Sequence, residues 1–197
     1  MIKAYKYRLK PNREQEKALR RECGTVRYVY NWALEKKIEA YSTEKKTLSE
    51  FDLIKMVTVL KRTEGLEWIA ETAQNQTLCA SMRNLNSAYT KFFKEKKGFP
   101  KFKKKGRSRD SITFFRSFHI DADANEGTRK GKIKVPRLGW LNAHIDRIPS
   151  ADSELKMMTV SHDPSGKWFA SVVFDNLRQV PEKKSLPKME NTVGIDL

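Results

Sequence analysis

The order of two periodicities constrains the fold of this 197-residue chain more than any other feature. Residues 1–10 alternate between apolar and charged side chains and stop at Pro11, which predicts one short strand. Residues 11–97 then follow helical spacing, and strand patterns return only from Ser111 to residue 176. The simplest arrangement is an α+β fold: a small β-barrel whose first strand is separated from the others by a helical insertion.

Capping residues and apolar spacing predict four helices in the insertion. Asn12 and Gln15 form a capping box at the first helix, and Gly24 suits the position after its end. Ser49 caps the third helix, and a short turn is expected at Trp68. The expected helices cover about 12–23, 25–41, 49–60 and 73–97.

The second half contains short strand-like runs. Two of them flank Asp163–Gly166, a turn sequence that predicts a hairpin. Trp140 and Trp168 are more typical of a core than of a nucleic-acid surface. Beyond residue 176 a polar linker is expected, and then an apolar run that delivers Asp196 at its end, as in the metal sites of many nucleases.

Charge points to a polyanionic partner. Forty Lys and Arg residues face 24 Asp and Glu residues, for a net charge of +16. This excess favours binding to nucleic acid. No run reaches the roughly 18 apolar residues of a membrane span, and no apolar secretory segment follows Met1. A cytoplasmic, nucleoid-associated protein is expected, with Cys23 and Cys79 reduced and no zinc site from its scattered histidines.

Three segments could contact nucleic acid. Residues 27–32 hold an arginine, an asparagine and three aromatic side chains, which either stack on bases or join the core. Residues 94–107 hold eight cations with two phenylalanines, which suit a phosphate backbone or form a solvated run. The polar start of the long helix, residues 74–81, either reads base edges or faces solvent.

Taken in order, several motifs resemble the TnpB or OrfB-type proteins of bacterial insertion sequences, transposon-encoded RNA-guided endonucleases related to type V CRISPR effectors. The resemblance covers essentially the whole chain. The matching segments are 5–11 with Gln15, 27–34, 85–93, 98–103, 135–139, 166–171 and 193–197, the last of which resembles the first RuvC motif.

This resemblance implies a domain organisation. A wedge-type β-barrel is split by a helical recognition insertion with a helix-turn-helix-like start, and a RuvC nuclease domain of the RNase H type follows. The implied ranges are 1–10 for the first wedge strand, 11–97 for the insertion, 98–110 for a basic linker, 111–176 for the rest of the wedge, 177–190 for a linker, and 191–197 for the start of RuvC.

The resemblance also implies site residues. Those expected to read a short DNA motif are Ser49, Glu50, Asn75, Gln76, Cys79, Ser81, Phe114, Arg116 and Ser117. Those expected at the nucleic-acid backbone or in stacking are Lys3, Tyr5, Arg8, Arg27, Tyr28, Tyr30, Asn31, Trp32, Lys101, Phe102, Lys103, Lys104, Lys105, Arg107 and Arg137. Asp196 is the expected first RuvC acid and a partial magnesium ligand.

The implied partners are a guide RNA from the transposon end, double-stranded target DNA with a short adjacent motif, and a C-terminal nuclease polypeptide. Magnesium is expected for the full-length family enzyme, whose remaining acids and zinc ribbon are absent here. We therefore expect a chain that takes part in DNA transposition and recombination, binds nucleic acid, and does not cleave it alone. A non-cleaving DNA-binding repressor and a basic RNA-binding scaffold are the alternatives.

Overall fold

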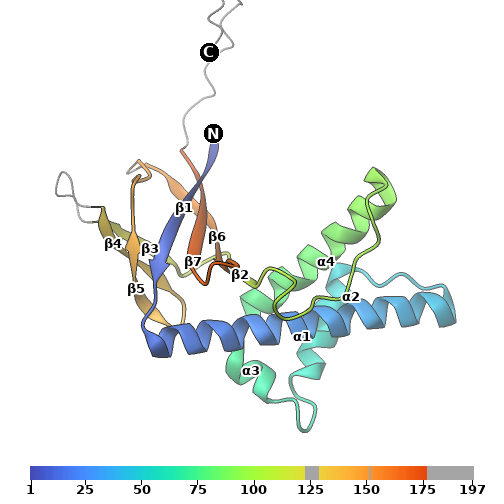
Figure 1. Cartoon of the computed structure of the whole chain (residues 1–197). Helices are drawn as coiled ribbons and strands as arrows, with labels where there is room; N and C mark the ends of the chain where they lie inside the picture. The colour runs from blue at the N-terminus through green and yellow to red at the C-terminus, as the bar shows by residue number, and fades with distance from the viewer. Residues whose placement is uncertain (123–128, 151, 177–197) are drawn as a thin grey trace, which may run out of the picture.

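The computed structural model describes residues 1–122, 129–150 and 152–176. These residues form an α+β fold, with a curved antiparallel sheet on one side and a group of helices on the other (Figure 1). The predicted linker at 177–190 and the predicted strand at 191–197, with Asp196, lie outside the described residues. None of the described helices is long and apolar enough to cross a membrane.

The sheet contains seven strands in the order β2-β6-β7-β1-β5-β4-β3, and every neighbouring pair is antiparallel. Strands β2 and β3 are its edges, so the described residues form an open sheet. The strands are β1 (Ile2–Lys10), β2 (Ser111–Phe114), β3 (His119–Ala122), β4 (Lys130–Val135), β5 (Gly139–His144), β6 (Glu154–His162) and β7 (Trp168–Asp175).

Strand β1 lies between β7 and β5, although the helical segment separates it from both in sequence. Tyr7 pairs with Ala170 of β7, and Leu9 pairs with Ala143 of β5. Tyr7 and Leu9 point into the core, whereas the alternate residues of β1 are exposed. The prediction that the first strand joins the later ones is therefore confirmed.

The predicted hairpin at Asp163–Gly166 is also confirmed. The Asp163 carboxylate accepts hydrogen bonds from the Ser165 hydroxyl at 2.7 Å and from the Lys167 backbone N–H at 3.0 Å. Gly166 takes a φ of +79°, which favours glycine. This local network joins β6 to β7.

Helix α1 (Arg13–Glu44) is one continuous helix, so the predicted break at Gly24 is wrong. The capping box of Asn12 and Gln15 is present, as expected. Buried residues continue along the same side of the helix on both sides of Gly24, from Leu19 to Leu34. A glycine inside a helix costs about 1 kcal/mol relative to alanine. Burial of several apolar side chains, each worth about 1.5–3 kcal/mol, outweighs that cost.

Helices α2 (Glu50–Leu60) and α4 (Asn75–Glu95) match the predicted third and fourth helices. Between them, α3 (Trp68–Thr72) forms a short helix where a turn was expected. Ser49 caps α2 in a capping box with Asp52, as predicted for the third helix. Along α4, the buried seam of Leu78, Met82 and Leu85 confirms the predicted apolar spacing. Both cysteines are free thiols; Cys23 is buried and Cys79 is half-buried.

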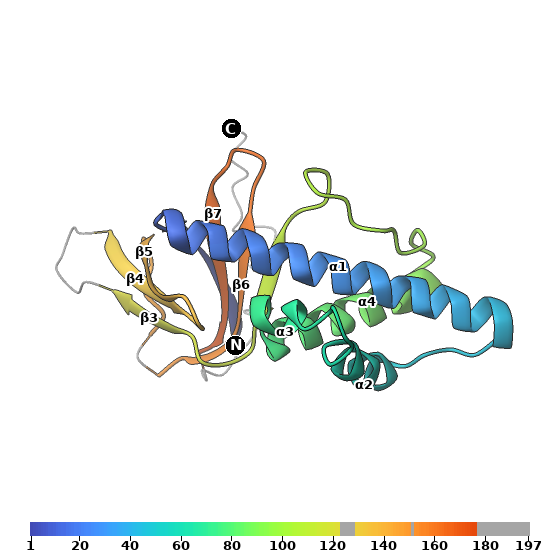
Figure 2. The same ribbon diagram turned by 90° about the horizontal axis from the view of Figure 1, so that it is seen from below.

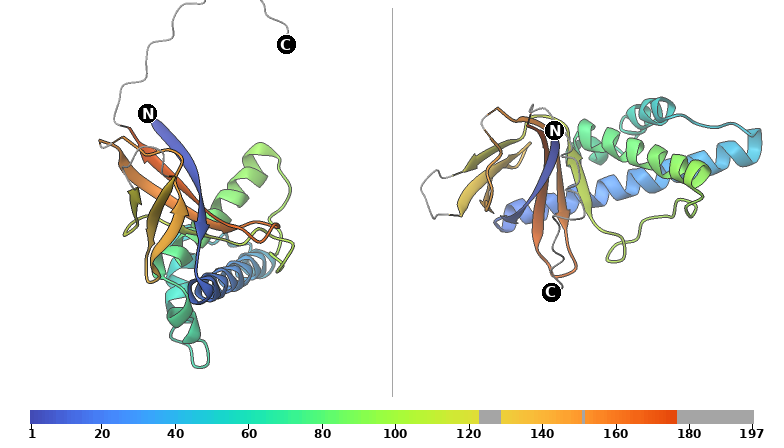
Figure 3. Two further views of the ribbon diagram at one scale, coloured as in Figure 1. Left: turned by 60° about the vertical axis from the view of Figure 1, so that its left-hand side comes forward. Right: turned by 90° about the horizontal axis from the view of Figure 1, so that it is seen from above.

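The start of α1 lies against one end of the sheet, and the rest of the helix extends away from the sheet alongside α4 (Figures 2 and 3). Helix α2 packs against α4. The Gln15 amide attaches this start to β5 by donating to the carbonyl groups of Leu138 at 3.3 Å and Trp140 at 3.1 Å. A single apolar cluster connects the inner face of the sheet with the helices. The two halves of the fold therefore share one core.

Candidate nucleic-acid interface

One face of the sheet is covered by cations. On β1 the exposed side chains are Lys6, Arg8 and Lys10, and on β4 they are Lys130, Lys132 and Lys134. We call these six residues the basic sheet face. Strand β5 lies between them and contributes Trp140, Asn142 and His144 to the same face.

The strand register aligns these side chains in rows across three strands. Arg8 pairs with His144, which also pairs with Lys130. Lys10 pairs with Asn142, which also pairs with Lys132. Side chains directly opposite on one face of a sheet are close neighbours. The rows therefore place cations on both sides of β5, as a phosphate backbone would require.

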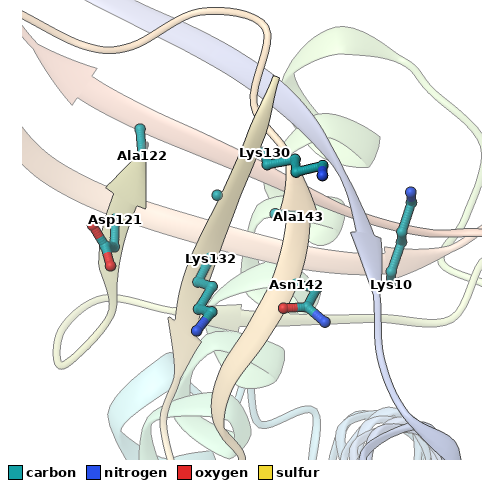
Figure 4. Close-up of a pocket in the computed structure, with 8 residues that line it drawn as sticks. Lys10, Asp121, Ala122, Lys130, Lys132, Asn142 and Ala143 are labelled. Atoms are coloured by element: carbon teal, nitrogen blue, oxygen red, sulfur yellow. The ribbon is translucent and has the colours of Figure 1, made fainter. Parts of the chain in front are cut away.

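A shallow hollow of about 620 Å³ lies within this face (Figure 4). Lys10, Lys130, Lys132 and Asn142 border it, and Asp121 of β3 provides its acidic side. Among the described residues, no carboxylate lies within ion-pair distance of any cation of the basic sheet face. These charges are thus available to an external anion.

Aromatic rings accompany the cations. Trp140 is 44 % exposed beside Lys134, its partner across the strands, so the expectation that Trp140 is a core residue is wrong. It faces outward because it alternates with the buried Leu141. Trp168 is buried, as expected. The Lys6 ammonium lies 4.1 Å above the ring centre of Phe169. Such rings can stack on bases.

Three residues of β1 are expected to contact the nucleic-acid backbone or to stack on bases: Lys3, Tyr5 and Arg8. Of these, only Arg8 belongs to this face. Lys3 and Tyr5 occupy alternate positions and therefore project from the opposite side of the strand. Tyr5 is half-buried there, with its ring 4.7 Å from that of Phe174. Lys132 and Lys134 were interpreted only as part of an alternating strand, and Lys130 as part of the polar turn before it, so the basic face was missed. Their period of two was the signal that they share one face.

The lysine-rich linker is attached to α1 at one point. The Asn31 side chain accepts from the Lys103 backbone N–H at 2.8 Å and donates to the Lys103 carbonyl at 2.9 Å. The Lys103 ammonium lies 4.1 Å above the ring of Tyr30, which is itself buried. Burial lowers the pKa of Lys103. These three side chains hold the linker and are not free for a ligand.

Several predicted contacts near this attachment remain exposed: Tyr28, Lys101, Phe102, Lys104, Lys105 and Arg107. Arg27 is half-buried and forms an ion pair with Asp110. Trp32 is half-buried and packs against the core. Some of the side chains at 27–32 therefore join the core, whereas others, such as Tyr28, stay exposed. Arg137, in the β4–β5 turn, donates to the Ala70 carbonyl at 3.3 Å.

The predicted DNA-reading residues meet at the junction of α4 with the end of β2. The Gln76 amide oxygen accepts from the backbone N–H groups of Phe115 at 3.1 Å and Arg116 at 3.4 Å. Asn75, the first residue of α4, accepts a hydrogen bond from the Lys61 ammonium. Ser117 has a φ of +63°, so the chain turns sharply after β2. The structure thus brings Asn75, Gln76, Arg116 and Ser117 together.

Three residues of that predicted set are buried or already engaged in the fold of this structure. Ser81 is 2 % exposed, and its hydroxyl is directed at the Val26 carbonyl, 3.5 Å away. Phe114 is fully buried because it is on the inner face of β2. Ser49 is occupied as the cap of α2.

Sequence reasoning missed Arg83 at this junction. Its guanidinium donates to the Glu50 carboxylate at 3.3 Å and lies 4.8 Å from the ring centre of Phe115. Arg83 follows Cys79 by four residues and Gln76 by seven, so all three share one side of α4. That spacing was the available signal. Glu50 is therefore balanced by an arginine, and Cys79 lies half-buried between the two polar residues.

A buried carboxylate positions the start of α4. Glu22 of α1 is 4 % exposed and accepts from the Gln74 N–H at 3.2 Å and the Thr77 hydroxyl at 2.8 Å. The Gln74 side chain does not cap the N-terminus of α4, so the Glu22 carboxylate of α1 satisfies the Gln74 N–H instead. The Gln74 amide also donates to the Pro136 carbonyl at 2.9 Å. Burial raises the pKa of Glu22, and these hydrogen bonds oppose that effect.

The described residues do not fit a metal centre. In the described ranges, no three His, Cys, Asp or Glu side chains converge to hold an ion. The predicted magnesium ligand, Asp196, lies outside these ranges.

Comparison with known proteins identifies relatives of the chain. The helix-turn-helix domain family HTH_OrfB_IS605 matches residues 1–46. In this structure those residues contain β1 and the single helix α1. The chain is 27% identical over 195 residues to an Escherichia coli (strain K12) protein with the provisional name RNA-guided DNA endonuclease InsQ. That alignment covers 99% of this chain and 45% of the relative.

A Streptomyces pristinaespiralis protein, also provisionally named an RNA-guided DNA endonuclease, is 30% identical over 175 residues, which cover 88% of this chain and 42% of the relative. The chain thus spans less than half the length of each of these relatives. With a family match at its N-terminus and relatives that align along most of its length, the chain is similar to TnpB/OrfB-type proteins.

Proposed function

We propose that this chain binds a guide RNA and a target DNA as the N-terminal part of a TnpB-type RNA-guided DNA endonuclease associated with transposition. The observation that carries the proposal is the basic sheet face, whose six cations form no ion pair within 4.0 Å among the described residues and are opposed across the strands by a single carboxylate, that of Asp121 opposite Lys132. Neutralising phosphates with unpaired cations is the main source of affinity for nucleic acid. The DNA-binding character of the family and the endonuclease names of the relatives agree with it.

In this proposal the curved sheet serves as the wedge-type barrel and holds the RNA. Trp140 and Phe169 supply stacking surfaces beside the lysines. The helical segment at 11–97 is the recognition insertion, 98–110 is the basic linker, and 111–176 completes the wedge.

The junction of α4 with the end of β2 is the proposed site of DNA-motif reading. Asn75 and Arg116 are exposed there, and both side-chain types form bidentate hydrogen bonds with base edges. Gln76 contributes by fixing the backbone of Phe115 and Arg116. The exposed residues Lys101, Lys104, Lys105 and Arg107 of the linker would contact phosphates.

In this proposal, cleavage belongs to a RuvC domain in which Asp196 is the first of several acids. Magnesium held by those acids would activate water and stabilise the leaving group.

The test of RNA binding compares two triple variants with equal loss of charge. One variant replaces Lys130, Lys132 and Lys134 by Gln and so removes half of the basic sheet face. The other replaces Lys46, Lys55 and Lys91, three exposed lysines of the helical half, by Gln. Affinity for a structured RNA taken from the transposon end is measured by fluorescence anisotropy at several salt concentrations. The sheet variant should reduce the slope of log Kd against log salt by about 2–3, since each phosphate contact contributes about 0.7–0.9.

The helical-half variant should change that slope by less than 1, as an order-of-magnitude expectation for lysines outside the interface. Equal losses in the two triples would remove the sheet face from the RNA-binding site. Absence of binding to RNA and to DNA by the unaltered chain would overturn the proposed function as a whole.

A further inference from the structure

A second basic hollow lies between α1 and α3, away from the sheet face. Its volume is about 550 Å³, within the range of about 300–1,000 Å³ that small-ligand sites occupy. We call it the α1–α3 hollow. The residues that matter for its chemistry are Arg21, Gly24, Arg27, Trp68, Lys105 and Asp110.

The charge balance of the hollow favours an anion. Arg27 is paired with Asp110, and Arg20, at the rim, is paired with Glu16. In the part of the chain that the structure describes, neither Arg21 nor Lys105 has a carboxylate within ion-pair distance. Two uncompensated cations from α1 and from the linker therefore face one cavity.

One wall of the hollow is aromatic. Trp68 is 36 % exposed and borders the cavity, and the ring of Tyr28 lies 5.3 Å from it. Tyr28 is 40 % exposed. An accessible indole next to unpaired cations matches an unpaired base joined to a phosphate, because the base can stack while the phosphate is neutralised.

Gly24 forms part of the floor, and its identity is not required by the fold. It lies inside the continuous helix α1, and the nearest atom to an added Cβ would be the flexible guanidinium of Arg27 at 3.9 Å. Alanine would thus fit without a clash and would favour the helix. The absence of a side chain at Gly24 therefore leaves this part of the hollow open.

We propose that the α1–α3 hollow binds one unpaired nucleotide of a nucleic-acid strand, with its phosphate on Arg21 and Lys105 and its base against Trp68. The proposal rests on the proposed function, because it assigns a further subsite for the same class of partner. Both single-stranded RNA and single-stranded DNA carry this chemistry, and the experiment distinguishes them.

The experiment compares Gly24→Leu, which fills the hollow, with Gly24→Ala as the matched control. Gly24→Ala should raise the Tm by about 2–4 °C through helix propensity and leave binding unchanged. Gly24→Leu should keep a Tm at or above that of the unaltered chain but weaken binding of a single-stranded oligonucleotide about tenfold, since the steric block removes the stacked unit.

The probes are one sequence as single-stranded RNA, as single-stranded DNA and as duplex DNA, measured by fluorescence anisotropy. Duplex binding should change less than about twofold, because its paired bases cannot enter the hollow. A tenfold loss with either single strand supports the proposal, and the larger loss identifies whether RNA or DNA is the source. A second variant, Arg21→Gln with Lys105→Gln, should reproduce the loss without filling the cavity.

Indistinguishable single-strand affinities of the Gly24→Leu and Gly24→Ala variants would overturn this subsite while leaving the proposed function intact. If the unaltered chain binds none of the three probes, the proposed function itself fails. If Gly24→Leu lowers the Tm, the test relies on the variant Arg21→Gln with Lys105→Gln. An unchanged single-strand affinity of that variant would also overturn the subsite.

Discussion

The basic sheet face and the junction of α4 with the end of β2 use polar residues in opposite ways. On the sheet face, the six cations project from alternate strand positions without carboxylate partners in the described ranges. At the junction, Glu22, Gln74 and Gln76 are committed to hydrogen bonds with other segments. The first arrangement suits a phosphate backbone of any sequence, and the second fixes the geometry that base reading requires.

The largest effect on stability should come from the buried end of the junction. Replacing Glu22 by alanine removes the acceptor of the buried Gln74 N–H and one of the two acceptors near the Thr77 hydroxyl, which keeps the Gln74 carbonyl at 2.8 Å. The free energy of unfolding should fall by about 1–3 kcal/mol. Lys132→Ala on the sheet face should change it by less than about 0.5 kcal/mol. Urea denaturation measures both, and similar values would show that the two regions are not energetically distinct.

Glu22→Gln isolates the charge, because an amide oxygen still accepts the hydrogen bonds. The folded-state pKa of Glu22 is raised by burial, so its contribution to stability is present below the ordinary carboxyl pKa and is lost as pH rises through the folded value. Relative to the unaltered chain, the glutamine variant should therefore gain stability as the pH rises above the ordinary carboxyl pKa of about 4. A stability difference that is independent of pH would contradict the raised pKa.

An intermediate effect is expected for DNA-sequence preference at the exposed end of the junction. Exchanging the two amides, Asn75→Gln with Gln76→Asn, shortens the side chain that holds Phe115 and Arg116 and should cost about 1 kcal/mol of stability. The preferred duplex motif should change, because the reading groups move. Selection from a randomised duplex library measures the motif; an unchanged motif would remove both residues from the reading surface.

The smallest effects should separate two kinds of lysine in the linker. Lys103→Ala removes a half-buried ammonium from the Tyr30 ring and should cost about 0.5–1 kcal/mol of unfolding free energy. Lys101→Ala with Lys104→Ala should leave stability unchanged but reduce the salt slope of RNA binding by about 1–2. If Lys103→Ala alone produced the larger change in slope, the linker would bind RNA through its attached segment.

The features that were predicted correctly from the sequence are those that depend on contacts between residues close together in the chain. The capping boxes at Asn12 and Ser49 and the Asp163–Gly166 hairpin depend on contacts within a few residues, and all three are present. The break at Gly24 was wrong because the strength of a local helix stop depends on what the rest of the helix buries. Trp140 was misjudged because strand alternation places a residue on one of two faces without showing which face is covered.

The sequence by itself determined the net charge of +16, the order of one strand, a helical segment and a later region of strands, and the resemblance of these motifs to a known family. Only the tertiary structure decided which charges act together. Lys6, Arg8 and Lys10 join Lys130, Lys132 and Lys134 because β5 pairs with both β1 and β4. Glu22 becomes a buried cap for α4 because α1 passes its start. Pairing and burial of this kind arise between segments far apart in the chain, so no local pattern encodes them.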